Sequence, residues 1–552
     1  MAKKCVGGDL KCSDFALSKN WFFIYILSVL KRIIMLGLKN IPGLQKLVWT
    51  IKNYTKGSVL PYNGRWELVK TIIKDLSDVP DCENEKKNII IFASNQLWSE
   101  YLILISCFLY KLGFDVTFLW TDSQVEQKIN DLFMDWSSKH PIPQYSRLRF
   151  INIDNIGVKN GENDEWPKEL EEMVKKVTEN DVRYSFKNEL LEKTESENNF
   201  YQARKSKNLE FFKKLRFFLK DKEDYVAITG NGTFYEMGIF YYFNTYLEKK
   251  CVTIDTFELN EGLVVDWEKP SVEWNTSRVW NYFKDIVVSA QCSEYFNADF
   301  KRRSSKKTGF QHADVEDGRK VLENLGINND YPVVLLCGNL VWDSAVLNMQ
   351  RTFGGMEEAF NKTIAWAEYK KINLVIRMHP VEAVVDQPKS LEDRIRSSWP
   401  SLPANVFIIS SGQKVSSYSL FPVIKCAIVY TSTIGLEMAS YGIPVITLAK
   451  AHYAKKGFTF DPETSEEYYN MLDQVCQNEM AFYSCQNIDL AKKYYYIYFN
   501  YFPKSLPWRL LSLRKDLAEK SPKIFFDKNF PQIYKDTMTF ISGESVPPRG
   551  WL

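Results

Sequence analysis

Short apolar runs alternate with stretches of helical spacing from residue 87 onward. The runs are continuous rather than alternately apolar and polar, which is typical of strands buried on both faces of a parallel sheet. A strand–helix–strand order of this kind predicts an α/β fold. Two series of runs predict two Rossmann-like parallel-sheet domains that face a cleft. The expected strands are residues 88–94, 115–122, 147–154, 224–232 and 251–258, then 332–339, 372–380, 405–410, 426–432 and 443–449.

Other stretches divide the chain into regions. Dense mixed charge over residues 160–223 predicts a helical insertion with a solvated face. The polar, basic stretch 298–318 predicts an interdomain linker or mobile loop, and the chain after residue 464 is helical and very aromatic. We therefore expect an N-terminal extension at 1–60, a first domain at 85–305, a second domain at 325–480 and C-terminal helices at 481–552 that pack back on the first domain.

The N-terminal extension is strongly basic. Residues 1–56 carry ten Lys or Arg and two Asp, a net charge of +8, around the uncharged run 20–30. Eleven residues are too few for a membrane span, which needs about 20. No small-residue cleavage site follows, so a secretory signal fits poorly. Two interpretations stay open: peripheral contact with an anionic membrane surface, or a helix packed on the rest of the protein.

Composition narrows the class of protein. The chain has 552 residues, 45% hydrophobic and 25% charged, which excludes a disordered or fibrous protein. A net charge of +3 predicts no nucleic-acid partner. Ten scattered cysteines without a C-x-x-C pair indicate reduced thiols and a cytoplasmic location. With four histidines, we expect no metal site and no cofactor.

The first candidate site is the run Arg377-Met378-His379-Pro380. Residues at i and i+2 of a strand face the same way, so Arg377 and His379 should project together. Pro380 should end the strand and place His379 at its carboxyl end, the edge where ligands bind in open α/β sheets. An arginine fork beside an imidazole suits a phosphate. The alternative is a structural histidine next to a salt-bridged arginine.

The second candidate is the run 430–437, YTSTIGLE, where a strand ends in hydroxyl residues and a helix begins. The free N–H groups and positive dipole end of that helix should bind an anion, and Ser432 and Thr433 would extend the site. Glu437 lies one turn into the helix, where it could accept hydrogen bonds from the ribose of a nucleotide. The alternative is simple N-capping by Ser432 or Thr433.

Weaker candidates also follow expected strands. Gly338 and Asn339 come directly after a strand of the second domain, and Asp343 should overhang the same edge. In the first domain, Glu236 and Glu258 should face the cleft. Each of these is equally compatible with an ordinary turn.

In order, the second-domain segments read VLLCGNLVWDS, LVIRMHP, NVFIIS and VYTSTIGLEMASYGIPVITLAKAHYAKKGFT. Over residues 332–464 this resembles the capsule polysaccharide biosynthesis glycosyltransferases, the group that includes capsular β-Kdo transferases. It is more distantly similar to HP-motif bacterial sialyltransferases. The resemblance implies a GT-B fold and a CMP-activated sugar, with the second domain binding the nucleotide sugar and the first binding the acceptor.

The resemblance also implies roles for individual residues. His379, Ser432 and Thr433 would hold the donor phosphate and Glu437 the ribose. The donor pocket would be lined by His452, Tyr453 and Gly457. The chain has no acid–base motif of the sialyltransferase kind, so the resemblance assigns no catalytic base. It has no D-x-D motif at a strand end in the cleft, consistent with metal-independent transfer.

The sequence therefore predicts a glycosyltransferase that moves a Kdo- or sialic-acid-like sugar from a nucleotide to a surface polysaccharide or glycolipid. Transfer needs a carboxylate base or nucleophile, and the candidates are Asp343, Glu258 and Glu236. Three alternatives stay open: a sugar-nucleotide epimerase, a polyol-phosphate transferase, and a catalytically silent glycan-assembly subunit.

Overall fold

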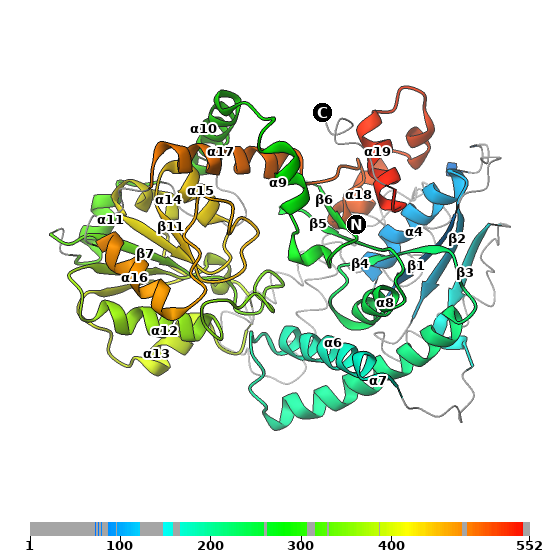
Figure 1. Ribbon diagram of the computed structural model, residues 1–552, viewed down its shortest axis with the longest axis horizontal. Coiled ribbons are helices and arrows are strands. Elements are labelled where there is room, and N and C mark those ends of the chain that lie inside the picture. The colour runs from blue at the N-terminus through cyan, green and yellow to red at the C-terminus, as the bar shows by residue number, and fades with distance from the viewer. Residues whose placement is uncertain are drawn as a thin grey trace, which may run out of the picture. The chain divides into compact units, whose positions relative to one another are not determined.

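Two twisted sheets with helices on both faces organise the chain (Figure 1). The computed structural model describes residues 72, 75–76, 79, 87–94, 96–121, 147–157, 166–258, 262–305, 315–327, 330–385, 387–476 and 483–544. The predicted N-terminal extension at 1–60 lies outside the described residues.

The first sheet has the strand order β3-β2-β1-β4-β5-β6. All pairs are parallel except β5 with β6, which are antiparallel. Phe92 on β1 contacts Phe211 and Phe240 on the helices that cover one face, and α4 covers the other face (Figure 1). The strands are β1 (Asn88–Ala93), β2 (Asp115–Trp120), β3 (Leu148–Asn152), β4 (Tyr225–Gly230), β5 (Cys251–Thr256) and β6 (Leu263–Asp266). The helices are α4 (Gln96–Lys111), α6 (Lys168–Phe186), α7 (Glu195–Leu219) and α8 (Tyr235–Tyr246).

The second sheet has the order β11-β10-β7-β8-β9, and all its pairs are parallel. Successive residues of each strand feed two separate apolar cores, so Leu335 and Leu336 of β7 belong to opposite faces. The strands are β7 (Val333–Cys337), β8 (Asn373–Arg377), β9 (Val406–Ile409), β10 (Cys426–Val429) and β11 (Val445–Thr447). The helices around it are α9 (Ser277–Phe283), α10 (Ser289–Ser305), α11 (Gly318–Asn324), α12 (Met356–Ala367), α13 (Leu391–Ser398), α14 (Ser417–Leu420), α15 (Ile434–Tyr441), α16 (Ser465–Cys476) and α17 (Cys485–Asn500).

The predicted fold class is confirmed: both sheets are parallel-dominated, and both have the strand order of a Rossmann-like α/β fold. The helical insertion is observed as α6 and α7. One prediction is wrong over part of its length, because residues 298–305 of the expected linker belong to α10. The antiparallel strand β6 was not predicted, since its four residues follow β5 after a short connection.

The C-terminal segment contacts helices that cover both sheets. Helix α17 packs on α10 and α15, and the chain then returns to α4, where Trp508 and Phe525 stack on Phe108. Helices α18 (Leu513–Glu519) and α19 (Gln532–Ile541) follow, and Arg514 pairs with Glu100 of α4. No helix within the described part of the chain is long and apolar enough to span a bilayer.

The turn between α6 and α7 also connects the helices of the first sheet with segments around the second sheet. Glu189 in this turn accepts hydrogen bonds from the Tyr430 hydroxyl at 2.6 Å, from the Met356 amide at 2.7 Å and from Gln350 at 3.1 Å. All three donors belong to the second half of the chain. Burial raises the pKa of Glu189, and the three hydrogen bonds oppose that rise because they favour the charged form.

Candidate functional site

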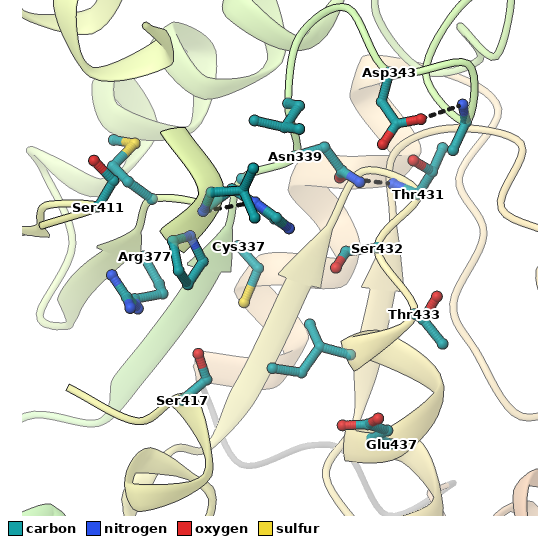
Figure 2. Close-up of a pocket in the computed structure, with 18 of the residues that line it drawn as sticks. Cys337, Asn339, Asp343, Arg377, Ser411, Ser417, Thr431, Ser432, Thr433 and Glu437 are labelled. Carbon is teal, nitrogen blue, oxygen red and sulfur yellow. Dashed lines mark hydrogen bonds between the residues drawn. The ribbon is translucent and has the colours of Figure 1, made fainter. Parts of the chain in front are cut away.

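A cavity of about 670 Å3 lies at the carboxyl ends of the strands of the second sheet (Figure 2). Segments that follow β7, β8, β9, β10 and β11 all contribute side chains, as expected for the ligand-binding edge of an open α/β sheet. Residues from β5 to α10 close the other side. The predicted residues that line the cavity are Gly338, Asn339, Asp343, Arg377, His379, Ser432, Thr433, Glu437, His452 and Glu258.

His379 lies just beyond β8 and begins a 3-10 turn at Pro380–Ala383. Its Nδ1 accepts a hydrogen bond from the Val381 amide at 3.3 Å, so in the neutral ring the proton is on Nε2. Burial lowers the pKa of His379, and the Asp343 carboxylate partly opposes this. The imidazole is therefore a neutral hydrogen-bond donor beside the cavity at pH 7.

Arg377 points at the segment after β9 rather than standing free beside His379. Its Nη1 donates to the carbonyl of Ser410 at 3.0 Å, and its Nη2 donates to the carbonyl of Val415 at 3.1 Å. Burial lowers the pKa of Arg377. The arginine thus fixes the 410–417 segment, which forms one wall of the cavity (Figure 2). Its positive charge lies next to the cavity.

The start of α15 is open toward the cavity. Thr433 is the N-cap residue, yet its side chain makes no capping hydrogen bond. The loop before it is held from below, because the Tyr453 hydroxyl donates to the Ser432 carbonyl at 2.6 Å and Asn339 Oδ1 accepts from the Thr431 amide at 3.3 Å. The side chains of Ser432 and Thr433 are therefore not needed as caps and face the cavity (Figure 2).

Several buried polar atoms around the cavity have no hydrogen-bond partner among the described residues. They belong to side chains from four different segments, and each of these side chains lines the cavity. Buried polar atoms are normally paired, so a cluster of unpaired ones facing a cavity indicates a polar occupant. The atoms are Arg377 Nε, Ser416 Oγ, Thr431 Oγ1 and His452 Nε2.

Sequence reasoning missed Arg303, which enters the cavity from α10. Its Nη1 lies 3.4 Å from Glu437 Oε1 and 3.8 Å from Glu258 Oε2, so one cation bridges two predicted site carboxylates. Its Nε donates to Asp299 at 2.8 Å. Burial raises the pKa of Glu437 to about 7, and the Arg303 charge opposes this. Glu258 also accepts a hydrogen bond from Tyr498 at 2.9 Å.

An aromatic wall closes the cavity beside Glu258. His452 stacks on Tyr498 with ring centroids 4.3 Å apart, and Trp274 lies 5.7 Å from His452. His452 Nδ1 is 2.9 Å from the Tyr494 hydroxyl, and burial lowers the pKa of His452 to about 3, so the ring is neutral. Trp274 adopts a left-handed backbone conformation, with φ 46°. That conformation is strained for a bulky side chain and is typical of functional sites.

The carboxylate candidates occupy different surroundings. Asp343 lines the cavity and accepts hydrogen bonds from Ser344 and from the Ala345 amide, both at 3.2 Å. Asp255, at the carboxyl end of β5, was not predicted and is not among the residues that line the cavity. Burial raises its pKa to about 7, and the nearby charge of Asp343 adds to this. The rule that ligands lie at the carboxyl ends of parallel strands would have found it.

Three predicted residues do not line the cavity: Glu236, Tyr453 and Gly457. Glu236 is fully buried in α8, where its Oε1 lies 3.2 Å from Nη2 of Arg204. Arg204 also pairs with Asp181 at 3.3 Å, so Glu236 belongs to an internal ion network. Tyr453 is fully buried and supports the α15 start from behind. The described residues contain no group of three or more His, Cys, Asp or Glu side chains arranged to hold a metal ion.

Comparisons with known proteins show what the chain is similar to. Among solved structures, the chain is similar to the β-Kdo 2,4-transferase of KpsC from Thermosulfurimonas dismutans, with 14% identity, 50% of this chain and 84% of that chain covered, and a TM-score of 0.32. It is also similar to the β-Kdo 2,7-transferase of that protein, with 13% identity, 45% and 72% coverage and a TM-score of 0.27. A third is the UDP-GlcNAc 2-epimerase from Neisseria meningitidis, with 11% identity, 74% and 98% coverage and a TM-score of 0.24.

A search of the curated proteins finds no match. Because the TM-scores are low, the similarity to a known family depends on the sequence match alone. That match is to the model of the capsule polysaccharide biosynthesis proteins over residues 273–501, which include the second sheet and every cavity residue except Glu258 and Val272. This segment of the chain is thus similar to the capsule polysaccharide biosynthesis proteins, the family that its motifs resemble.

Proposed function

We propose that the protein is a metal-independent glycosyltransferase of the GT-B type. In this proposal it moves a Kdo- or sialic-acid-like sugar from a CMP-linked donor to a surface polysaccharide or glycolipid. The observation that carries the proposal is the set of unpaired buried polar atoms in residues that line one cavity within the segment matched by the family model. A volume of about 670 Å3 is in the range of nucleotide-sized ligand sites.

The donor phosphate would lie between His379 and the start of α15. His379 Nε2–H, the hydroxyls of Ser432 and Thr433 and the first free amides of the helix can all donate to one anion. These groups are held by the surrounding backbone before any ligand arrives. Donors fixed in this way stabilise charge that develops on the phosphate when the sugar leaves.

The nucleoside would extend toward α10 and the segment after β9. Glu437 is held by Arg303 at 3.4 Å, so its carboxylate is positioned to accept from ribose hydroxyls. Ser416 Oγ, unpaired and buried, faces the same region and can bond a polar group of the base. We assign the nucleoside to this end because the hydrogen-bonding groups there can serve both ribose and base.

Transfer would break the bond between the anomeric carbon and the phosphate oxygen, which keeps the electron pair. The acceptor hydroxyl oxygen forms the new bond and loses its proton to a carboxylate. Asp255 and Asp343 suit this role best, because Glu258 is bonded to Tyr498 and Arg303. If a carboxylate instead attacks the anomeric carbon first, the product retains the donor configuration.

Thermal unfolding with CMP, CDP, UDP, GDP and ADP tests the donor assignment. We expect CMP at about 100 times its Kd to add about 2.7 kcal/mol to the free energy of unfolding. His379→Asn should abolish most of that gain and lower turnover by about 10²–10³. Asparagine keeps a side-chain acceptor for the Val381 amide but loses the Nε2–H donor, so the turn should survive. The exposed variant Lys362→Ala is the control. Wild-type CMP binding and turnover in His379→Asn would refute the phosphate role.

The alternatives give different products. Nucleotide binding without turnover on any acceptor would indicate a silent assembly subunit. Release of an epimerised sugar, or transfer of a polyol phosphate, would identify the other two alternatives by mass spectrometry and NMR of the product.

We further propose that residues 1–56 contact an anionic membrane surface peripherally. The support is the charge of +8 around a short apolar run. Co-sedimentation with anionic vesicles should be strong at low salt and weak at high salt. Failure to bind such vesicles at low salt would refute the membrane role.

A further inference from the structure

A cluster of aromatic side chains lies just outside the cavity, where the two halves of the chain meet. Tyr184, at the end of α6, lies 4.8 Å from Phe234 and 6.0 Å from Trp342, measured between ring centroids. The ammonium of Lys187 lies 5.4 Å from the Trp342 ring. Tyr184 is 39% exposed, and Trp342 is partly exposed. Rings that only packed the two halves together would be covered.

This cluster adjoins the cavity, because Trp342 directly precedes Asp343, which lines it. Burial raises the pKa of the Tyr184 hydroxyl, and the charges of Tyr235, Asp343 and Asp255 add to this, so both carboxylates lie near that hydroxyl. A group bound on these aromatics would therefore lie near the carboxylates proposed to receive the acceptor proton.

The rings are fixed before any ligand binds. Trp342 Nε1 donates to Gln387 at 3.0 Å, which orients the indole. Arg183, next to Tyr184, donates to Asn348 at 2.7 Å and ties the end of α6 to the loop that carries Trp342. A surface held in this way can bind without the entropic cost of ordering its own side chains.

We propose that Tyr184 and Trp342 form the acceptor subsite, on which a pyranose ring of the acceptor glycan packs. The C–H face of a pyranose is apolar and flat enough to lie on an aromatic ring, while its hydroxyls reach neighbouring polar groups. This rests on the proposed glycosyltransferase function and adds the position and the chemistry of the acceptor. The site would select saccharide acceptors and leave donor binding to the cavity.

An array of immobilised neutral and acidic bacterial oligosaccharides tests the subsite directly. The full-length protein, saturated with CMP, should bind a subset of the array. The double variant Tyr184→Ala/Trp342→Ala should lose about fivefold or more in affinity for that subset, because both rings on which the sugar packs are removed. Tyr184→Phe/Trp342→Phe keeps an aromatic ring at each position and should bind within about threefold of wild type.

Two controls separate this proposal from the proposed function. CMP-induced thermal stabilisation should be unchanged in the alanine variant, because the donor cavity is intact. Tyr369→Ala removes a tyrosine that is 83% exposed and lies outside the cavity lining, and it should bind the array like wild type. The subsite is refuted if no oligosaccharide binds the wild type, or if the alanine variant binds as wild type does. If CMP does not stabilise the wild type, the donor assignment is refuted instead.

Discussion

The two sheets of this protein share a strand order but differ in what happens at their strand ends. In the second sheet, four residues that line the cavity at the carboxyl edge carry buried polar atoms without a partner among the described residues. In the first sheet, the loop after β4 pairs most of its polar groups: Asn231 Oδ1 accepts from the amides of Thr233 and Phe234, and Asp181 accepts from the Tyr235 amide, while Thr233 Oγ1 has no partner among the described residues.

This difference shows how one architecture can serve two purposes. Pairing every polar group inside the protein stabilises it but leaves nothing to offer a ligand. Leaving buried groups unpaired lowers stability by about 1–3 kcal/mol each and reserves them for an occupant. The second half is thus built to bind. The first half contributes Glu258 to the same cavity, where α10 places Arg303 beside it.

The largest expected effect concerns Asp255 of the first half, which forms no ion pair with a cation among the described residues. Asp255→Asn should lower turnover by about 10²–10⁴, because it removes the proposed proton acceptor. Burial raises the Asp255 pKa to about 7, so its basic form appears as the pH rises through 7. Wild-type kcat/KM should therefore rise across pH 6–8, and the variant should lose that limb. Asp343→Asn distinguishes the two carboxylates. A retained limb with full turnover in Asp255→Asn would contradict the assignment.

A substitution in the ion network around Arg204 should change the stability of the protein instead of its turnover. Glu236→Ala leaves the buried Arg204 with one carboxylate fewer and should cost about 3–5 kcal/mol in the free energy of unfolding. Glu210→Ala breaks an exposed pair with Lys214 and should cost less than about 1 kcal/mol. Denaturant unfolding measures both. A stable Glu236→Ala protein that had lost turnover would instead make Glu236 a catalytic residue.

Substitutions at the start of α15 should instead weaken ligand binding and leave stability unchanged. Ser432→Ala/Thr433→Ala should weaken CMP binding by about 10²–10⁴-fold, since each of the two hydrogen bonds to a charged group contributes about 1.5–3 kcal/mol, while the ligand-free protein melts normally. Ser390→Ala is the matched control, because Ser390 does cap α13 with Asp393. It should cost about 1 kcal/mol of stability and leave CMP affinity unchanged. Equal CMP affinity in the double variant would mean that the hydroxyls do not touch the phosphate.

The smallest expected effect is a pH dependence of stability. It arises at Lys504, in the segment that leads from α17 back to the first sheet. Burial lowers the pKa of Lys504 to about 7, below its value in the unfolded chain. Between these two pKa values the unfolded chain binds more protons, so the contribution of Lys504 to stability rises with pH above about 7. Lys504→Met should raise Tm at pH 7 and flatten its rise toward pH 9.5. The exposed Lys528→Met should change neither, and a steep rise in Lys504→Met would assign the dependence to another group.

Sequence reasoning succeeded where one segment carries its own signal. Apolar runs predicted the strands, and the ends of β8 and β10 placed His379, Ser432 and Thr433 beside one cavity. It failed where distant segments meet. Arg303 lies in a run of basic residues that reads as a linker, and its partners Glu258 and Glu437 are far from it in the chain.

The carboxylates show the same limit. The end of β5 was expected at residue 258, whereas the strand ends at Thr256, so Glu258 was chosen and Asp255 was not. Glu236 follows a glycine-rich turn, which suggested a loop over the cleft. Its burial depends on Arg204, a residue of a different helix that nothing in the local pattern connects to it.

The turn between α6 and α7 has a consequence for the time course of a reaction in this cavity. Glu189 bonds to Tyr430, which directly precedes the Thr431-Ser432-Thr433 run, and also to the start of α12. Widening the gap between the halves must break these contacts and disturb the loop beside the proposed phosphate site in the same movement. In the proposed reaction, departure of the spent nucleotide and separation of the halves would then be one event, and the rate of that event would depend on solvent viscosity.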